Sequence, residues 1–397
     1  MNAIAQTSTA ASEIVEILQG LLPPGHGPYQ LHEPELSERE RELVDEAMTE
    51  GFVSYAGRHV GLFEQALARA CGTREAVAVV SGTAALQVIL HTLGIGNGEE
   101  VLCPSLTFVA TANAIVHAGA VPHFADSHPD HLGLDSERLR TYLGQIGERR
   151  DGVLRNRRTG RRIAAIMPVH VFGHVGRPQE LCEVAAEFGL PIIEDATEAL
   201  GSASASCPVM RMGVAAALSF NGNKIVTTGG GGAIVTDDAA LAARLRHVTT
   251  TAKRPHPWRF DHDEVGFNYR LPNLNAALGL AQLERLEDFL RRKRRLALAY
   301  RDAFARNGRW KFIEEPSGCR SNYWLNAVKA PVADGTLIEE ALESLHAAGY
   351  KCRPCWTPMH QLAIHAGHPR DALPVAEDLA RRIICLPSSA RLSEYLQ

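Results

Sequence analysis

The sequence has 397 residues, 45% of them hydrophobic and 22% charged, and a formal net charge of −4. This composition is typical of a globular protein with one large and one smaller domain, and it lacks the positive field that nucleic acid or an anionic membrane would require. The N-terminal residues do not resemble a secretory signal, and no apolar run approaches the ~20 residues of a membrane span. Together with eight scattered cysteines, these features predict a cytoplasmic protein whose partners are small molecules.

Seven short apolar runs between residues 75 and 238 have the character of strands, and helical patterns such as AALQVILHTLG and PQELCEVAAEFG lie between them. This alternation predicts an α/β fold with a mostly parallel central sheet and helices on both faces, because parallel strands need crossover connections. The predicted strands are EAVAVVSG (75–82), EEVLCPSLTF (99–108), AVPHFAD (120–126), RIAAIMPVHVFG (162–173), PIIEDAT (191–197), GVAAALSF (213–220) and GGAIVTDD (231–238).

The rest of the chain divides into simpler segments. GERRDGVLRNRRTGRR (147–162) is predicted to form a hairpin-like surface insertion, and one long amphipathic helix is predicted from Leu274 to about Ala305, with RRKRR (291–295) as a solvated face. WLNAVKA predicts a strand and 336–348 a helix in a smaller C-terminal α+β domain. We therefore expect an N-terminal segment over 1–35, a large α/β domain over 36–285 and the small domain over 286–397.

Two glycine-containing stretches suggest an anion site. SGTAAL (81–86) joins a strand directly to a helix, whose free backbone N–H groups could bind a phosphate; alternatively, Thr83 only caps the helix. SFNGNKIVTTGGGG (219–232) sets Lys224 before four glycines, a backbone that a large flat group could approach closely. Neither a Walker P-loop nor a strand-anchored G-x-G-x-x-G is present.

Three polar side chains follow buried strands of the same predicted sheet. Asp195 ends the strand of PIIEDATEALGS, and GVAAALSF leads to Ser219 and then Lys224. Ligands of open α/β sheets bind at the carboxyl ends of the strands. An anion site, a carboxylate and an isolated lysine match the needs of pyridoxal 5′-phosphate: the lysine forms a Schiff base, and the carboxylate keeps the pyridine nitrogen protonated.

The sequence resembles the DegT/DnrJ/EryC1/StrS family of nucleotide-sugar aminotransferases that depend on pyridoxal phosphate and have the aspartate aminotransferase-like (type I) fold. The resemblance covers almost the whole chain. It rests on SGTAAL, PSLTFVATANAI, PVHVFGH, EDATEALGS, SFNGNKIVTTGGGGAIVTDD and GFNYRLPNLNAALGLAQL, with weaker similarity at RSNYWL, WTPMHQL and LPSS.

The resemblance implies a role for each matching residue. Lys224 would carry the Schiff base, Asp195 would pair with the pyridine nitrogen and Phe108 would stack on the ring. Asn268 of GFNYR would reach the cofactor phosphate of a neighbouring subunit, which implies a homodimer with shared active sites. The weaker motifs imply substrate contacts by Tyr323 and His360. The cofactor phosphate would be bound by Thr83 and Ala84 at the helix end, with Ser219 as a further donor.

One position departs from the family pattern. Glu198 stands where the family commonly has His or Gln near the ring hydroxyl, and a second carboxylate there would be repelled unless it is protonated or turned away. Sequences with Glu at this position and the GNK lysine motif resemble a LegC-like subgroup that acts on UDP-linked 4-keto-6-deoxy N-acetylhexosamines, and they are also similar to perosamine-type enzymes. The implied reaction transfers the amino group of L-glutamate to the sugar's 4-keto carbon and releases 2-oxoglutarate.

Three alternatives are weighed against this interpretation. A related sugar dehydratase would have histidine at the position of Lys224, and a non-catalytic regulator would bind the cofactor without turnover. A zinc site is disfavoured because the segment lacks a second cysteine pair and is interrupted by two prolines, so we expect no metal site. The candidate zinc ligands are Cys352, Cys355, His360, His365 and His368.

Overall fold

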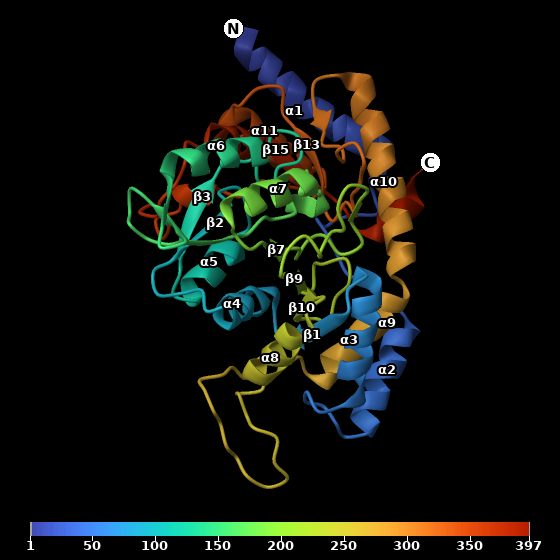
Figure 1. The fold of residues 1–397 in the computed structure, drawn as a ribbon. Coiled ribbons are helices and arrows are strands. Elements are labelled where there is room, and N and C mark those ends of the chain that lie inside the picture. The colour runs from blue at the N-terminus through green and yellow to red at the C-terminus, as the bar shows by residue number, and fades with distance from the viewer. Residues whose placement is uncertain (1, 397) are drawn as a thin grey trace.

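The central sheet positions most of the candidate residues. A computed structural model describes residues 2–396 (Figure 1). Strands in the order β1-β10-β9-β7 continue, through bridges at Ile166–Ile192 and Val169–Asp195, into β6-β2-β3. Only β10 is antiparallel to its neighbours in these ladders, which confirms the mostly parallel sheet. Each predicted run supplies one strand: β1 (Glu75–Val79), β2 (Glu100–Pro104), β3 (Val121–Ala125), β6 (Ile163–Ile166), β7 (Ile193–Asp195), β9 (Ala215–Ser219) and β10 (Gly232–Thr236).

Helices cover both faces of this sheet. Successive side chains of a strand point to opposite faces, and in β2 they enter different cores: Val101 and Cys103 pack in the core that includes α4 and α5, whereas Leu102 packs with α6 and α7. The strands are therefore buried on both sides, as their apolar sequences predicted. The helices are α3 (Arg58–Cys71), α4 (Gly82–Thr92), α5 (Val109–His117), α6 (Ser136–Ile146), α7 (Pro178–Phe188) and α8 (Ala239–Thr249).

A second, antiparallel sheet is formed by the C-terminal part of the chain, in the order β11-β13-β15-β14. The N-terminal helix α1 (Asn2–Leu21) shares a core with this part: Ile14 and Leu18 pack in one cluster with Tyr300, and the Trp310 indole donates to the carbonyl of Ala10 at 2.9 Å. The division at residues 35 and 285 stays a prediction. The elements here are β11 (Lys311–Phe312), β13 (Asn326–Lys329), β14 (Arg353–Pro354), β15 (Ile383–Leu386), α11 (Gly335–Ala347) and α12 (Pro374–Ala380).

The predicted long helix is two helices. α9 (Asn273–Glu284) and α10 (Leu286–Asn307) meet at Arg285, whose φ of −102° and ψ of 0° interrupt the helical backbone. The prediction for the basic run was wrong at Lys293, which is only 1% exposed and donates to the carbonyls of Trp324 and Ser388. Burial holds the pKa of this ammonium well below its usual range. The run is therefore not a uniformly solvated face.

The remaining elements lie at the periphery. The predicted insertion is confirmed as a hairpin of β4 (Gly147–Arg150) and β5 (Val153–Asn156). Between α8 and α9, residues 250–272 form a long loop whose middle part projects from the body of the molecule (Figure 1), whereas Ala252 and Leu271 near its ends are buried. Within the part of the chain described, no helix combines the length and apolarity needed to cross a membrane. The other elements are α2 (Glu38–Thr49), β8 (Ala203–Ser204), β12 (Cys319–Arg320) and the short 3-10 helices Val171–Gly173, Met359–Gln361 and Ala390–Tyr395.

Candidate active site

A cavity of about 680 Å³ opens where the carboxyl ends of β7 and β9 meet the N-terminus of α4. Residues of the second sheet and its flanking segments also line the cavity, among them Trp324 and Arg353. Asp195, Ser219 and Lys224 therefore line one cavity at the carboxyl ends of the strands, as predicted, although they are up to 29 positions apart in the chain.

Lys224 is held with its ammonium inside the cavity. Its Nζ lies 3.4 Å from Oε1 of Glu198 and 3.7 Å from the ring centroid of Trp324. The Trp324 indole donates at 2.8 Å to the carbonyl of Asn223, the residue before the lysine, so the same ring contacts both the backbone and the amine of this turn. Opposite charge and the aromatic face both stabilise an ammonium at this point.

Glu198 is a buried carboxyl group beside this lysine. Burial raises its pKa to about 7, although the positive charge of Lys224 and a 2.8 Å hydrogen bond from the backbone N–H of Phe172 act in the opposite direction. Phe172 has a φ of +57°, an unfavourable conformation for a bulky residue. Near neutral pH, Glu198 can therefore either hold or release a proton.

Asp195 ends β7 with both carboxylate oxygens hydrogen-bonded. Oδ2 accepts from the hydroxyl of Thr111 at 2.7 Å, and Oδ1 accepts from the hydroxyl of Thr197 at 2.7 Å and from its backbone N–H at 3.2 Å. These three hydrogen bonds fix the orientation of the carboxylate. The two threonines were missed by sequence reasoning, although Thr111 lies within PSLTFVATANAI, and Thr197 within EDATEALGS.

The first turn of α4 forms a cavity wall with free backbone donors. Ser81, and not Thr83, is the N-cap: its Oγ accepts from the N–H of Ala84 at 3.0 Å. The capping alternative for Thr83 is therefore wrong, and the Ala84 amide is already engaged. The N–H groups of Gly82 and Thr83 have no acceptor within the helix, because they belong to its first turn, and both residues line the cavity with Ser219.

The glycine run now has a structural explanation. Gly229 turns the chain with a φ of +77°, and Gly230 and Gly231 line the cavity. At Gly232, a Cβ would lie 2.3 Å from the carbonyl carbon of Ser81, so only glycine lets β10 pass this close to the start of α4. The glycines thus serve both the cavity and the packing of its helix.

Aromatic side chains form the apolar part of the wall. Phe108, the N-cap residue of α5, lines the cavity and remains 52% exposed. Its ring centroid lies 6.3 Å from that of Trp356, which in turn lies 5.0 Å from Phe172. Trp324 and Trp356 were missed by sequence reasoning, although both lie within the weakly similar motifs RSNYWL and WTPMHQL.

Four predicted site residues lie outside the cavity lining: Ala84, Tyr323, His360 and Asn268. Tyr323 is buried, and its hydroxyl accepts from the N–H of Glu315 at 3.2 Å. His360 is buried between the hydroxyl of Ser105, 2.7 Å from Nδ1, and Glu377, 3.1 Å from Nε2. A tryptophan of the same motif lines the cavity instead: Trp324 next to Tyr323, and Trp356 four positions before His360. Asn268 is exposed on the loop between α8 and α9.

Of the candidate zinc ligands, only His365 and His368 lie side by side, with ring centroids 5.3 Å apart. Cys352 lies in the core of the second sheet, Cys355 lines the cavity and His365 packs edge-on against Phe124. His360 is engaged as described above. These positions do not form a common ligand set.

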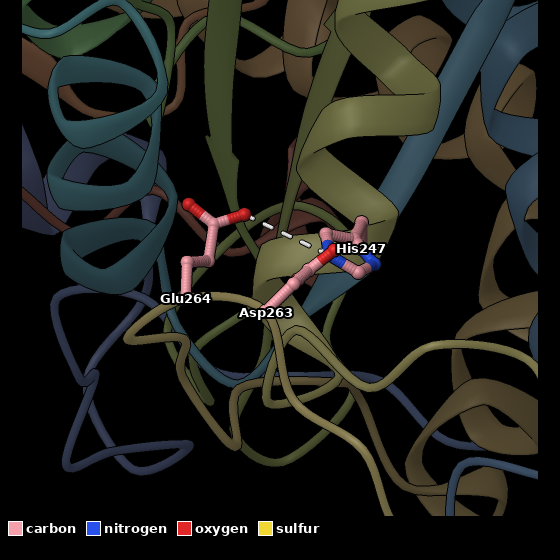
Figure 2. Close-up of side chains that lie close together, drawn as sticks. All are labelled: His247, Asp263 and Glu264. Carbon is pink, nitrogen blue, oxygen red and sulfur yellow. Dashed lines mark hydrogen bonds and ion pairs between the residues drawn. The ribbon is translucent and has the colours of Figure 1, made fainter.

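Among the residues described, a different trio has three side chains close enough for one ion: His247 on α8 with Asp263 and Glu264 on the following loop. Figure 2 shows both carboxylates directed toward the imidazole. Asp263 Oδ1 lies 2.7 Å from Nε2 of His247, but Arg254 pairs with Asp263 and Arg244 pairs with Glu264. The arginines already balance the negative charge, so the trio is explained as an ion-pair network that fastens the loop.

The cavity residues fit pyridoxal 5′-phosphate. The cofactor needs an amine, an anion-binding helix end and a carboxylate at its ring nitrogen. Lys224, the first turn of α4 and Asp195 provide these groups around one space. At Gly230 no atom lies within 4 Å of an added Cβ, so this part of the wall leaves room for a flat ring with a phosphate arm.

Comparisons with known proteins agree with this chemistry. A family model described as the DegT/DnrJ/EryC1/StrS aminotransferase family matches residues 34–396. The GDP-perosamine synthase of Caulobacter vibrioides is 36% identical over 364 residues, covering 91% of this chain and 93% of that protein. The GDP-perosamine synthase of Escherichia coli O157:H7 is 34% identical, covering 91% and 94%. The solved structure of DesI in the presence of its TDP-sugar product has a TM-score of 0.79 and 30% identity, covering 93% of this chain and 91% of that one.

Proposed function

The chain belongs to the DegT/DnrJ/EryC1/StrS family of sugar aminotransferases that depend on pyridoxal phosphate, and we propose that it converts a nucleotide-linked 4-keto-6-deoxy sugar to the 4-amino sugar. L-Glutamate is the amino donor and leaves as 2-oxoglutarate. The observation that carries the proposal is the meeting of the Lys224 amine, the Asp195 carboxylate and the first turn of α4 in one cavity.

Each of these cavity residues has its own role in the proposed reaction. Pyridoxal phosphate, when bound, supplies an electron sink for the carbanion formed beside the transferred nitrogen. Lys224 Nζ acts as the base at the donor's Cα, and Asp195 holds a proton on the ring nitrogen. Thr83 and Ser219, with the amides of the α4 turn, hold the phosphate, and Phe108 covers the ring. The Glu198 carboxyl group, 3.4 Å from Lys224 Nζ, orients the amine for this proton transfer.

Two nucleotides, UDP and GDP, are candidates for the nucleotide part of the substrate. The subgroup resemblance favours UDP, whereas relatives named GDP-perosamine synthase favour GDP. Both nucleotides are therefore compared in the experiment. The cytoplasm is the proposed location, supported by eight cysteines that are all free thiols.

We further propose that the protein forms a homodimer. Asn268 lies outside the cavity of its own chain, on a loop whose Trp258 and Phe260 are 75% and 81% exposed. Large exposed aromatic side chains are typical of contact surfaces. The ion pairs of Figure 2 fasten this loop to α8, which would present it to a second copy in a defined position.

The test is a turnover assay with glutamate and a panel of UDP- and GDP-linked 4-keto-6-deoxy sugars, with products identified by mass. Borohydride reduction of the holoenzyme should fix the cofactor on the peptide that contains Lys224. Lys293 is the informative rival, because burial holds the pKa of its ammonium group well below the usual range. Label on Lys293, or the absence of any 4-amino product across the panel, would contradict the proposal.

A further inference from the structure

The cavity contains a cation that the proposed mechanism does not use. Arg353 of β14 lines the cavity and is exposed, and no hydrogen bond or ion pair of its guanidinium occurs among the residues described. The other charged groups of the wall are engaged: Asp195 with two threonines, and Glu198 with Lys224. Arg353 therefore remains available to a ligand.

The backbone at this position is fixed although the guanidinium is free. Arg353 pairs with Cys385 of β15 in an antiparallel register, and the N–H of Cys355 donates to the carbonyl of Ile383 at 3.0 Å. Cys352 and Cys355, on either side of β14, are buried. Because this strand is already ordered, binding of a ligand by the Arg353 guanidinium would cost little backbone entropy.

The guanidinium chemistry defines the ligand. Its planar fork donates two parallel hydrogen bonds to a carboxylate or a phosphate, and such charge-assisted pairs are among the strongest in proteins. The cofactor phosphate is assigned to the α4 end. Both proposed substrates bring further oxyanions into the same cavity: two carboxylates on glutamate and a diphosphate on the nucleotide sugar.

We infer that Arg353 binds a substrate oxyanion and thereby contributes to substrate selection. This inference rests on the proposed function. Because the amino donor and the sugar react in separate half-reactions at one site, a single guanidinium can serve the carboxylate, the diphosphate or each in turn. Its contribution is to substrate binding, and proton transfer is left to Lys224.

The experiment compares Arg353→Gln, which removes the charge, with Arg353→Lys, which keeps it and loses the fork. Arg295→Gln is the matched control, since Arg295 is exposed on α10 and lies outside the cavity lining. The two half-reactions of the holoenzymes are followed separately by cofactor absorbance at increasing glutamate or nucleotide sugar. Circular dichroism and cofactor content verify folding.

We expect Arg353→Gln to weaken half-saturation about 10- to 100-fold in at least one half-reaction, the range expected for a lost charged hydrogen bond. The limiting rate should change less, because the lost contact is to bound substrate. A defect with glutamate alone identifies a carboxylate, and one with the sugar alone identifies the diphosphate. Arg353→Lys should recover part of the loss.

Unchanged half-saturation in both half-reactions of Arg353→Gln would overturn the inference while leaving the proposed function intact. If the wild-type enzyme aminates no sugar of the panel, the proposed function fails separately. Calorimetry of the holoenzyme with UDP, GDP and 2-oxoglutarate then decides the inference. Weaker binding of any of the three by Arg353→Gln than by Arg295→Gln supports it, and equal affinities for all three overturn it.

Discussion

Glu198 makes the stability of the cofactor-free protein depend on pH. Its pKa rises from 4.5 to about 7 because of burial, against the influence of Lys224. A carboxyl group whose pKa is raised on folding binds its proton more tightly in the native state, so its stabilising contribution is complete below pH 4.5 and is lost as pH rises toward 7. We expect Glu198→Gln, which cannot ionise, to gain stability relative to wild type across this window.

Urea unfolding of both apoproteins at several pH values from about 4 to 8 measures that difference. Its absolute value includes the altered contact with Lys224, so only its change with pH is diagnostic. Glu339→Gln is the control, since Glu339 is exposed on α11. A difference between wild type and Glu198→Gln that stays constant with pH would show that Glu198 does not retain its proton in the native state.

Some residues of the candidate site could be predicted from the sequence and others could not. Asp195, Ser219 and Lys224 were found because parallel strands converge at one sheet edge whatever the details of their connections. Tyr323 and His360 lie in segments without such a rule, where one or a few positions decide which side chain faces the cavity. The free guanidinium of Arg353 is likewise visible only after β14 is placed beside the central sheet.

At the scale of elements, α10 shows why a charge run cannot be interpreted as a unit. Lys293 lies three or four positions from Phe289, Leu290, Leu296 and Ala297, which are all buried. This spacing puts the lysine on the apolar face of the helix, while Arg291 and Arg295 are exposed. The periodicity was present in the sequence, but the break at Arg285 had no comparable signal.

The packing of β10 against α4 gives a second prediction. Because an added Cβ at residue 232 would lie 2.3 Å from Ser81 C and 2.6 Å from Gly82 N, Gly232→Ala must displace the first turn of α4. We expect a loss of about 1–3 kcal/mol in the free energy of unfolding and weaker binding of pyridoxal phosphate, measured by fluorescence titration of the apoprotein.

Gly222→Ala controls for the substitution itself, since the nearest atom to its added Cβ is 3.9 Å away and Gly222 does not line the cavity. Cofactor affinity should be unchanged in this variant. Wild-type affinity in Gly232→Ala would mean that the position of the α4 turn does not determine phosphate binding.

At the scale of the whole molecule, the active site is built from two sheets and, by our proposal, two subunits. The central sheet supplies Lys224 and Asp195, and the segments of the second sheet supply Trp324 and Arg353. In this proposal Asn268 joins them from another chain, since it lies outside the cavity lining of its own chain. The proposed subunit arrangement would then determine whether a site is complete.

Mixing two inactive variants tests this arrangement. A hybrid of Lys224→Ala and Asn268→Asp subunits has one site in which Lys224 and the partner-derived Asn268 are both native, so random exchange should restore about a quarter of wild-type activity. Lys224→Ala mixed with Asp195→Asn is the matched control: both residues serve the same chain, and neither hybrid site is complete. Differently tagged subunits, captured together, establish that exchange has occurred. If hybrids form and the first mixture remains as inactive as the control, Asn268 does not act across the dimer and the shared-site proposal is wrong.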